Sequence, residues 1–267
     1  MNERRIRTVL VIAMAICAAT ACAGSGTPTP GSSSKSPSAA TSLGSPASVA
    51  TTSNPQPPTA AGVQSACSDL GGTIDTNHLC HAHTSGRDYT IDFSFPADYP
   101  DQLAISDYLR HIRDDFIRSV ADTPARGSHY QLDVTAKAFR SGTPASGTQS
   151  VVFASYSESG GAHPVTSYEA FNYDLGKRAP IAFETLFKPD ANPLAVLDPI
   201  VQREMELHWR GNGGPAPRNT LGDKVYRDFA ITDDAVIFFF NQDGLLPHER
   251  GPLEVAVPRT DLAALLA

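Results

Sequence analysis

The stretch Ser155–Asp174, SYSESGGAHPVTSYEAFNYD, decides how the rest of the chain is interpreted. Residues 150–157 before the bend and residues 165–173 after it are rich in β-forming side chains. Between them lies Gly160-Gly161-Ala162-His163-Pro164, and two strands joined by a short glycine-containing turn form a β-hairpin. The sequence therefore predicts an antiparallel hairpin with a histidine at its bend.

The bend is also the first place to look for chemistry. In a serine hydrolase of the carboxylesterase type, a serine attacks, a histidine acts as its base and a carboxylate orients the imidazole. The residues here that could take these roles are Ser155, Ser157, Ser159, His163, Glu158 and Asp174. The alternative is structural: the glycines make the turn and His163 caps it. No G-x-S-x-G nucleophile elbow occurs in the chain.

The segment before this hairpin predicts a strand, a helix and a further strand. Residues 89–95 alternate between apolar and polar side chains, and Pro96 closes that strand. Between Pro100 and Val120 the apolar residues follow a helical period, with Pro100 in the first turn. Residues 130–136 alternate again, and the pattern continues toward Phe139.

The segment after the hairpin predicts a second helix and more strands. Residues 193–209 show helical spacing, and Pro199 suggests that the regular helix begins there. Residues 229–232 and 235–240 predict a hairpin turning at Asp233-Asp234, and the second of these strands is apolar on both faces, hence central and covered. A last strand at 253–257 is followed by a short helix, 261–266, capped by Thr260. Residues 211–222 are a loop.

Strands in antiparallel clusters with two main helices between them indicate an α+β fold. We expect residues 66–267 to form a single domain with a mixed, mostly antiparallel sheet and a short C-terminal helix. Roughly 200 residues are enough to bury one sizeable core.

The N-terminal 22 residues have the pattern of a lipoprotein-type signal peptide. Arg4, Arg5 and Arg7 precede an uncharged apolar run, residues 9–21, which is too short to span a bilayer comfortably. The run ends Ala19-Thr20-Ala21-Cys22, which resembles a lipobox although Ala19 replaces the usual large aliphatic residue. We expect Cys22 to carry the lipid. An ordinary cleaved signal peptide is the alternative.

Composition then separates a tether from the domain and limits the partners. Residues 23–65 are mostly Ser, Thr, Pro, Ala and Gly with Lys35 as their only charge, which predicts a disordered tether. Beyond residue 21 the chain has 18 basic and 27 acidic side chains, a formal charge of −9. Nucleic acid and anionic membranes repel such a chain, so membrane attachment would come from the lipid alone.

Two cysteines remain outside the signal, Cys67 and Cys80, and export to an oxidising compartment favours their pairing. His81 and His83 would share a strand face and, with His78, could suggest zinc, but no second His/Cys pair completes a known spacing. We expect no metal and no cofactor.

Two further groups have a structural explanation. Asp233, Asp234 and Asp243-Gly244 could suggest calcium, but they lack the EF-hand pattern and suit turns. Trp209 and the run Phe238-Phe239-Phe240 are expected in the core.

The order of motifs resembles the secreted immunogenic antigen family of mycobacteria. The segments that carry the resemblance are CSDLGG (67–72), YPDQ (99–102), GTQSVVF (147–153), GGAHP (160–164), SYEAFNYD (167–174), PIAFETLF (180–187) and FAITDDAVIFFFNQDGLLPHERGPLEVAVPRTDL (229–262). The later half is also similar to the domain of unknown function in the exterior region of the lysozyme-sensing anti-sigma factor RsiV.

The resemblance implies an α+β fold with β-grasp-like features, export, and an envelope or extracellular setting, without a settled activity. Together with the signal, tether and acidic domain, it predicts a non-catalytic binding domain. Its partner would be an extracellular protein or a cell-wall glycan. The rival is the carboxylesterase-type hydrolase at the bend.

Overall fold

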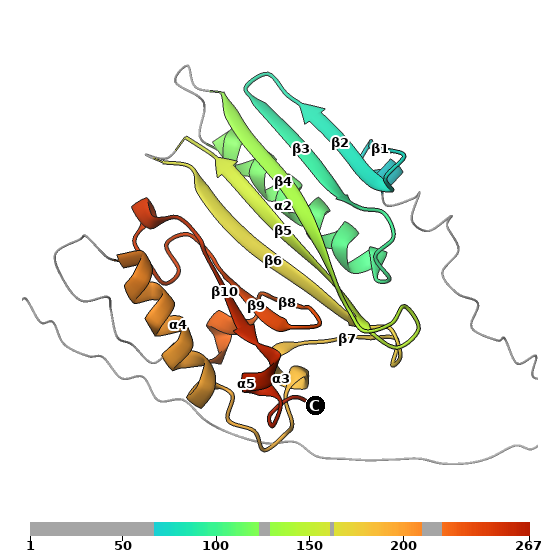
Figure 1. The fold of residues 1–267 in the computed structure, drawn as a ribbon. Coiled ribbons are helices and arrows are strands. Elements are labelled where there is room, and N and C mark those ends of the chain that lie inside the picture. The colour runs from blue at the N-terminus through green and yellow to red at the C-terminus, as the bar shows by residue number, and fades with distance from the viewer. Residues whose placement is uncertain (1–66, 123–128, 161–162, 210–220) are drawn as a thin grey trace, which may run out of the picture. The chain divides into compact units, whose positions relative to one another are not determined.

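The computed structural model describes residues 67–122, 129–160, 163–209 and 221–267. Cys17, Cys22 and the predicted signal and tether lie outside these residues, and so does most of the predicted 211–222 loop. Figure 1 shows helix α2 (Gln102–Asp122) across one face of a large sheet, with a smaller sheet and helix α4 (Leu194–Trp209) on the other side. The fold is α+β, as predicted.

The large sheet has seven strands in the order in which they occur along the chain. They are β1 (Thr73–Ile74), β2 (Leu79–Ser85), β3 (Tyr89–Pro96), β4 (Tyr130–Ser141), β5 (Thr148–Glu158), β6 (Val165–Asp174) and β7 (Ala179–Pro180). All neighbours are antiparallel except β3 and β4, which are parallel because α2 connects them across the face of the sheet. A helix on a mixed sheet is the β-grasp-like feature that the resemblance implied.

The remaining strands form a separate sheet in the order β10-β9-β8, where the sequence predicted only one sheet. β8 (Phe229–Ile231) and β9 (Ala235–Phe240) are the predicted acidic-turn hairpin, and β10 (Leu253–Pro258) pairs with the other side of β9. β9 is therefore the central strand of its sheet, as its two-sided apolar pattern indicated. Short helices complete this half: α3 (Phe183–Leu186), η1 (Asp223–Tyr226), η2 (His248–Arg250) and α5 (Arg259–Leu262).

Alternation along β9 produces the layering. Phe238 and Phe240 face α4 in one core, together with Leu197, Val201 and Met205 of that helix. Phe239 faces the large sheet, where it packs with Val152 of β5 and beside Ala230 of β8. On the far face of the large sheet, α2 contributes its apolar stripe, including Ile105, Leu109 and Phe116. The order of layers is α2, large sheet, small sheet, α4, and the strands at the centre are covered on both faces.

Three predicted helix boundaries were wrong. α2 begins after Asp101, whose Oδ1 accepts the Ala104 N–H at 3.2 Å, so Pro100 precedes the cap instead of opening the first turn. α4 begins at Leu194, ahead of Pro199, so the proline lies inside the helix and the helix lacks the one backbone hydrogen bond that Pro199 cannot donate. α5 begins at Arg259 after Pro258, so Thr260 lies inside the helix and does not cap it.

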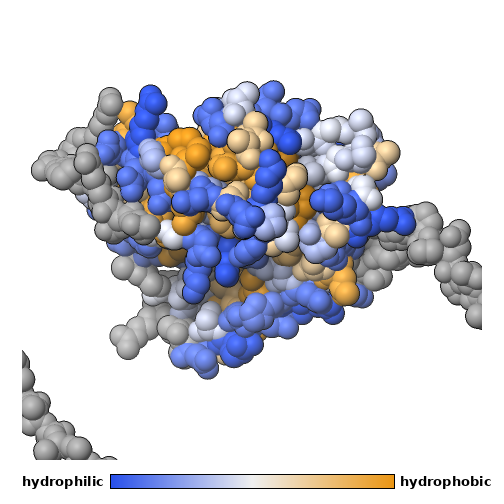
Figure 2. Space-filling view, turned by 90° about the horizontal axis from the view of Figure 1, so that it is seen from below, coloured by the Kyte–Doolittle hydropathy of each residue, from blue (hydrophilic) through white to orange (hydrophobic). Residues whose placement is uncertain are grey.

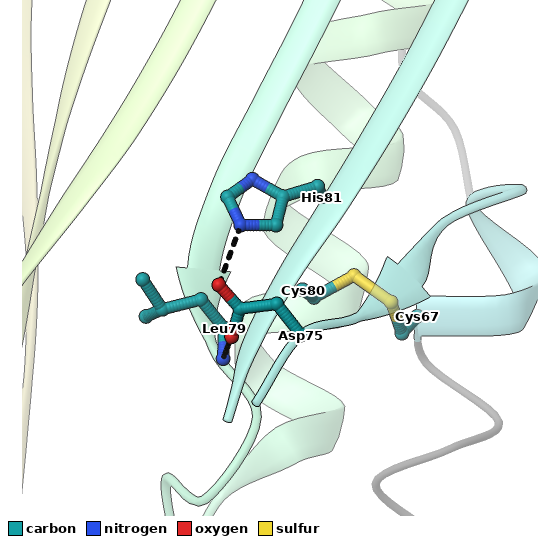
Figure 3. Close-up of a disulfide and its surroundings, with 5 residues drawn as sticks. All are labelled: Cys67, Asp75, Leu79, Cys80 and His81. Atoms are coloured by element: carbon teal, nitrogen blue, oxygen red, sulfur yellow. Dashed lines mark hydrogen bonds and ion pairs between the residues drawn. A yellow bond between two sulfur atoms is a disulfide. The ribbon is translucent and has the colours of Figure 1, made fainter. Parts of the chain in front are cut away.

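The first edge of the large sheet is closed by the predicted disulfide. Cys67 and Cys80 are bonded with their Cα atoms 5.8 Å apart, and both are buried. Figure 3 shows the bridge beside Asp75, whose Oδ1 accepts the Leu79 N–H at 3.0 Å and whose Oδ2 contacts His81 Nε2 at 3.2 Å. The bridge and this carboxylate hold the two-residue strand β1 against β2.

The other long edge, β6, is covered by side chains of the C-terminal half. Three backbone N–H groups of β6 donate to side-chain oxygens. The Thr166 N–H donates to Gln242 Oε1 at 2.9 Å, and the Tyr168 N–H donates to Asn241 Oδ1 at 2.6 Å. The Ala170 N–H donates to Asp228 Oδ1 at 3.0 Å. These bonds satisfy the edge of one sheet and attach the other sheet to it.

This edge makes a stability prediction. Replacing Asn241 by Ala leaves the Tyr168 N–H without its acceptor, and we expect unfolding to require about 1–2 kcal/mol less free energy in urea titrations. Asn77→Ala, in an exposed turn where only the backbone N–H of Asn77 is bonded, is the control and should change stability by no more than about 0.5 kcal/mol. Equal stability of the two variants would contradict the role of the edge bonds.

Candidate functional site

The structure separates the residues that the hydrolase hypothesis combined. Ser155 is buried on the α2 side of the sheet, where its Oγ lies 3.1 Å from the Tyr108 hydroxyl. Burial raises the pKa of Tyr108 to about 12, so this contact joins two neutral hydroxyls. Ser157 follows on the same face by strand alternation, and Ser159 and Glu158 are exposed near the bend. In the described structure no hydrogen bond joins these serines to His163.

Asp174 cannot orient His163. The strand register places Val165 opposite Ser157 and Asp174 opposite Thr148, at the two ends of β6. Nine residues of strand separate these ends by roughly 30 Å. Asp174 instead accepts the Lys177 N–H at 2.8 Å in the turn after β6.

The bend needs Gly160 on two counts. Its φ is +78°, which a residue with a Cβ rarely adopts, and a Cβ there would lie 2.6 Å from a carbon of the Tyr130 ring. Gly161 and Ala162 fall outside the described residues. At Gly160, the backbone of the turn therefore requires glycine.

His163 does have a partner, which no sequence motif predicted. Its ring lies 5.2 Å, centroid to centroid, from the ring of His248, a residue of the distant NQDGLLPHERG segment. His248 Nδ1 lies 2.9 Å from Asp243 Oδ2, and its Nε2 lies 3.2 Å from Gln242 Nε2. Asp243 has a φ of +65°, so the turn that presents its carboxylate is conformationally costly. Two imidazoles and one carboxylate thus meet beside the hairpin bend.

The predicted histidine cluster near the disulfide is divided among other partners. His81 contacts Asp75, and His83 Nδ1 lies 2.7 Å from Asp92 Oδ1. His78 occupies a turn at φ +60°. Among the described residues, no group of three or more His, Cys, Asp or Glu side chains is arranged to hold a metal ion.

The predicted turn aspartates and core aromatics are where the sequence placed them. Asp233 Oδ1 accepts the Gly142 N–H at 2.7 Å, which links the β8–β9 turn to the β4–β5 loop. This bond and the nearby Ser141 hydroxyl lower the pKa of the Asp233 carboxyl. Phe238, Phe239 and Phe240 are buried, and Trp209 packs against the same core.

A groove that sequence patterns did not reveal lies beside β6. Its volume is about 610 Å³, and it is bounded by the start of α2, the β6 edge, and the segment from β7 into α3. Tyr99, Phe171 and Phe183 form part of its walls. Its charged residues are Asp101, Glu169, Glu184, Asp228 and Arg227. Four carboxylates face one cation there.

Two of these carboxylates influence each other. Burial raises the pKa of Asp228 to about 7, and the nearby charge of Glu169 adds to that effect. Glu169 remains accessible to solvent, yet the surrounding protein still raises the pKa of its carboxyl. A cleft with carboxyl groups of raised pKa is a common property of functional sites. No pattern in the sequence marked either residue, because they lie about sixty positions apart.

Figure 2 shows one face of the molecule, on which apolar surface appears in limited patches among hydrophilic residues. Within the described residues no helix has the length and apolar character needed to cross a membrane.

Part of the chain matches a family model, and a solved structure shares the fold. Residues 184–260, from α3 to the start of α5, match the family model described as a protein of unknown function, DUF3298. A crystal structure of a DUF3298 family protein from Pseudomonas aeruginosa PAO1 has the same fold. It superposes with a TM-score of 0.52 at 15% identity, covering 74% of this chain and 96% of that one.

The chain belongs to the family of mycobacterial immunogenic proteins that includes MPT64 and MPB64. It is 40% identical to the immunogenic protein MPT64 of Mycobacterium tuberculosis over 75% of this chain and 88% of that protein. It is 43% identical over 77% of this chain and 91% of a second Mycobacterium tuberculosis protein, named esterase Rv3036c. The resemblance to this antigen family is confirmed, while kinship with the exterior domain of RsiV stays a prediction.

A more distant relative shares part of the chain. The peptidoglycan-N-acetylmuramic acid deacetylase PdaC of Bacillus subtilis is 28% identical over 126 residues, which are 45% of this chain and 26% of PdaC. The match therefore concerns about a quarter of that enzyme.

The groove carboxylates predict a pH dependence of stability. Because the pKa of Asp228 is about 7 in the folded protein and near 3.8 ordinarily, folding takes up a proton between these values. This contribution to stability is present at low pH and is lost as the pH rises through about 7. We expect a melting temperature higher near about pH 5.5 than near about pH 8.

Asp228→Asn tests the assignment, because an amide oxygen can still accept the Ala170 N–H while the charge is gone. This variant should gain stability mainly at the higher pH and flatten the profile. Glu158→Gln, at an exposed carboxyl on the hairpin, is the control and should leave the profile unchanged. An unaltered slope in Asp228→Asn would refute the assignment.

Proposed function

We propose that this protein is an exported, envelope-attached domain that binds a cell-wall glycan without catalysing a reaction. The observation that carries the proposal is the groove between α2, β6 and α3. Export is supported by the signal-like N-terminus and by relatives known as immunogenic proteins. Attachment through a lipid on Cys22 completes this proposal.

The chemistry of the groove suits a saccharide. Sugar rings present hydroxyl donors around an apolar ring face, and the groove offers carboxylate acceptors beside the partly exposed ring of Phe171. Its volume lies within the usual range for ligand sites. The carboxylates at its rim, Glu169 and Glu184, are exposed and accessible to a ligand. The partial match to an enzyme named for peptidoglycan is consistent with a shared glycan-handling role.

Sedimentation with insoluble peptidoglycan tests this function. We expect the protein to co-sediment, and Glu169→Ala combined with Glu184→Ala to weaken binding at least about tenfold, equivalent to about 1.4 kcal/mol. Asp122→Ala, an exposed carboxylate at the other end of α2 from the groove, is the matched control and should bind normally.

Two outcomes would overturn the glycan proposal. One is absence of binding to purified peptidoglycan. The other is binding to crude cell wall that disappears after protease treatment of the wall, which would assign the groove to a protein partner instead.

Hydrolysis of carboxylic esters is the second candidate function. It is favoured by the relative named esterase and by the His163, His248 and Asp243 cluster. In that reaction His248, oriented by Asp243, or His163 would serve as the base, and Ser157 or Ser159 as the nucleophile. Ser155 is disfavoured, since it is buried against Tyr108 on the α2 side.

Short-chain p-nitrophenyl esters separate the two functions. The binding proposal predicts a rate no higher than spontaneous hydrolysis. Turnover that falls at least about 100-fold in His163→Ala, and equally in one serine variant, would establish the hydrolase instead. Asp174→Asn is the control, because that residue lies at the far end of β6 and should leave any turnover intact.

A further inference from the structure

A second cavity lies at the other end of the large sheet from the histidine pair. Its volume is about 540 Å³, and it is enclosed by the β4–β5 loop, the turn after β6, the β7–α3 segment and the β8–β9 hairpin. The last residues of the chain close it, where the Ala267 N–H donates to the Leu186 carbonyl at 3.1 Å. Neither the groove carboxylates nor the histidines line this cavity.

Most of its wall is apolar. The apolar lining side chains are Pro180, Ile181, Leu186, Ile231, Val236 and Leu266. Several of them also belong to the core between the small sheet and α4, so the wall continues the protein interior. An apolar ligand group placed against it would leave water, at a gain of about 25 cal/mol per Å².

One fixed cation lines the same cavity. Arg259 Nη1 donates to the Ser141 hydroxyl at 2.8 Å and to the Thr232 carbonyl at 3.1 Å. Both acceptors are neutral, and in the described structure no ion pair joins Arg259 to a carboxylate. Two hydrogen bonds thus hold the guanidinium in position, and its positive charge can still attract an anionic ligand in the cavity. Asp233 lies near enough to interact with it only through space.

A second cation lies at the rim. Lys177 Nζ is exposed and lies 3.6 Å from Asp174 Oδ2. At that distance the pair is loose and accessible to solvent, so the ammonium can turn to another anion at little cost. Asp174 also lines the cavity, and it is the partner of Lys177. The cavity therefore combines apolar side chains with Arg259, which has no ion pair in the described structure, and with the loose Lys177–Asp174 pair.

We propose that this cavity binds a small amphiphile with a carboxylate head and an aliphatic body. The carboxylate is received by Arg259, whose planar fork matches its two oxygens, and Lys177 adds charge at the entrance. The aliphatic body lies along Pro180, Ile181 and Leu266, the apolar lining residues that keep accessible surface. The volume is typical of sites for small molecules. This site is independent of the glycan groove in its chemistry.

Decanoate is the probe for this site, titrated into the exported protein and followed by amide chemical shifts. We expect saturable changes at Gly147 and Ile231, with smaller or no changes at Tyr99 and Glu169 in the groove. Decanol, which has the same chain length without the charge, should bind at least about fivefold more weakly. Absence of saturable shifts around the cavity would overturn the proposal.

Variants separate the head-group site from the apolar wall. Arg259→Gln should weaken decanoate binding at least about fivefold and leave decanol unchanged, because the amide keeps a donor for Ser141 but loses the charge. Lys177→Gln, at an exposed position, supplies the same test at smaller magnitude if Arg259→Gln fails to fold. Arg118→Gln, an exposed arginine of α2, is the control. Unchanged decanoate affinity in folded Arg259→Gln would refute the head-group assignment.

Discussion

The part of the β6 edge that the two-residue strand β7 leaves open is the constraint on which the rest of the structure depends. Its backbone N–H groups must find acceptors or remain in water. Here the acceptors are the side chains of Asp228, Asn241 and Gln242, which belong to the small sheet and its connections. The same bonds therefore close one sheet and position the second. They also fix the carboxylate of Asp228 at the bottom of the groove, so its raised pKa follows from its structural role.

The sequence predicted what depends on local periodicity. Alternation identified the strands of both hairpins, and the helical stripes identified α2 and α4. Helix ends were less predictable. Pro100 is more conspicuous in the sequence than Asp101, which caps α2, and α4 extends ahead of Pro199 despite the backbone hydrogen bond that the proline cannot donate. Local sequence patterns could not predict that the strands divide into two sheets. It depends on side chains such as Asn241 pairing with backbone more than seventy residues away.

The candidate sites show the same limit. The sequence indicated His163 as a candidate site residue because it lies at a bend. It did not indicate that His248, far away in the sequence, lies next to His163. Glu169 and Asp228 carried no signal at all, since an acidic residue in a strand and another before a strand are ordinary. Burial and proximity give them their properties, and both arise only in the folded chain. Asp174 is close to His163 in sequence, but it lies at the opposite end of β6 and cannot orient the imidazole.

The segment from β7 into α3 separates the two cavities. Pro180, Ile181 and Thr185 line both, one from each side. Because this single segment lines both cavities, a shift toward one cavity moves it away from the other. Occupants that displace it would therefore influence each other's affinity, and thermodynamic linkage requires that influence to be equal in both directions. The shared segment is therefore a place where occupancy of one cavity would be felt in the other, through a few residues.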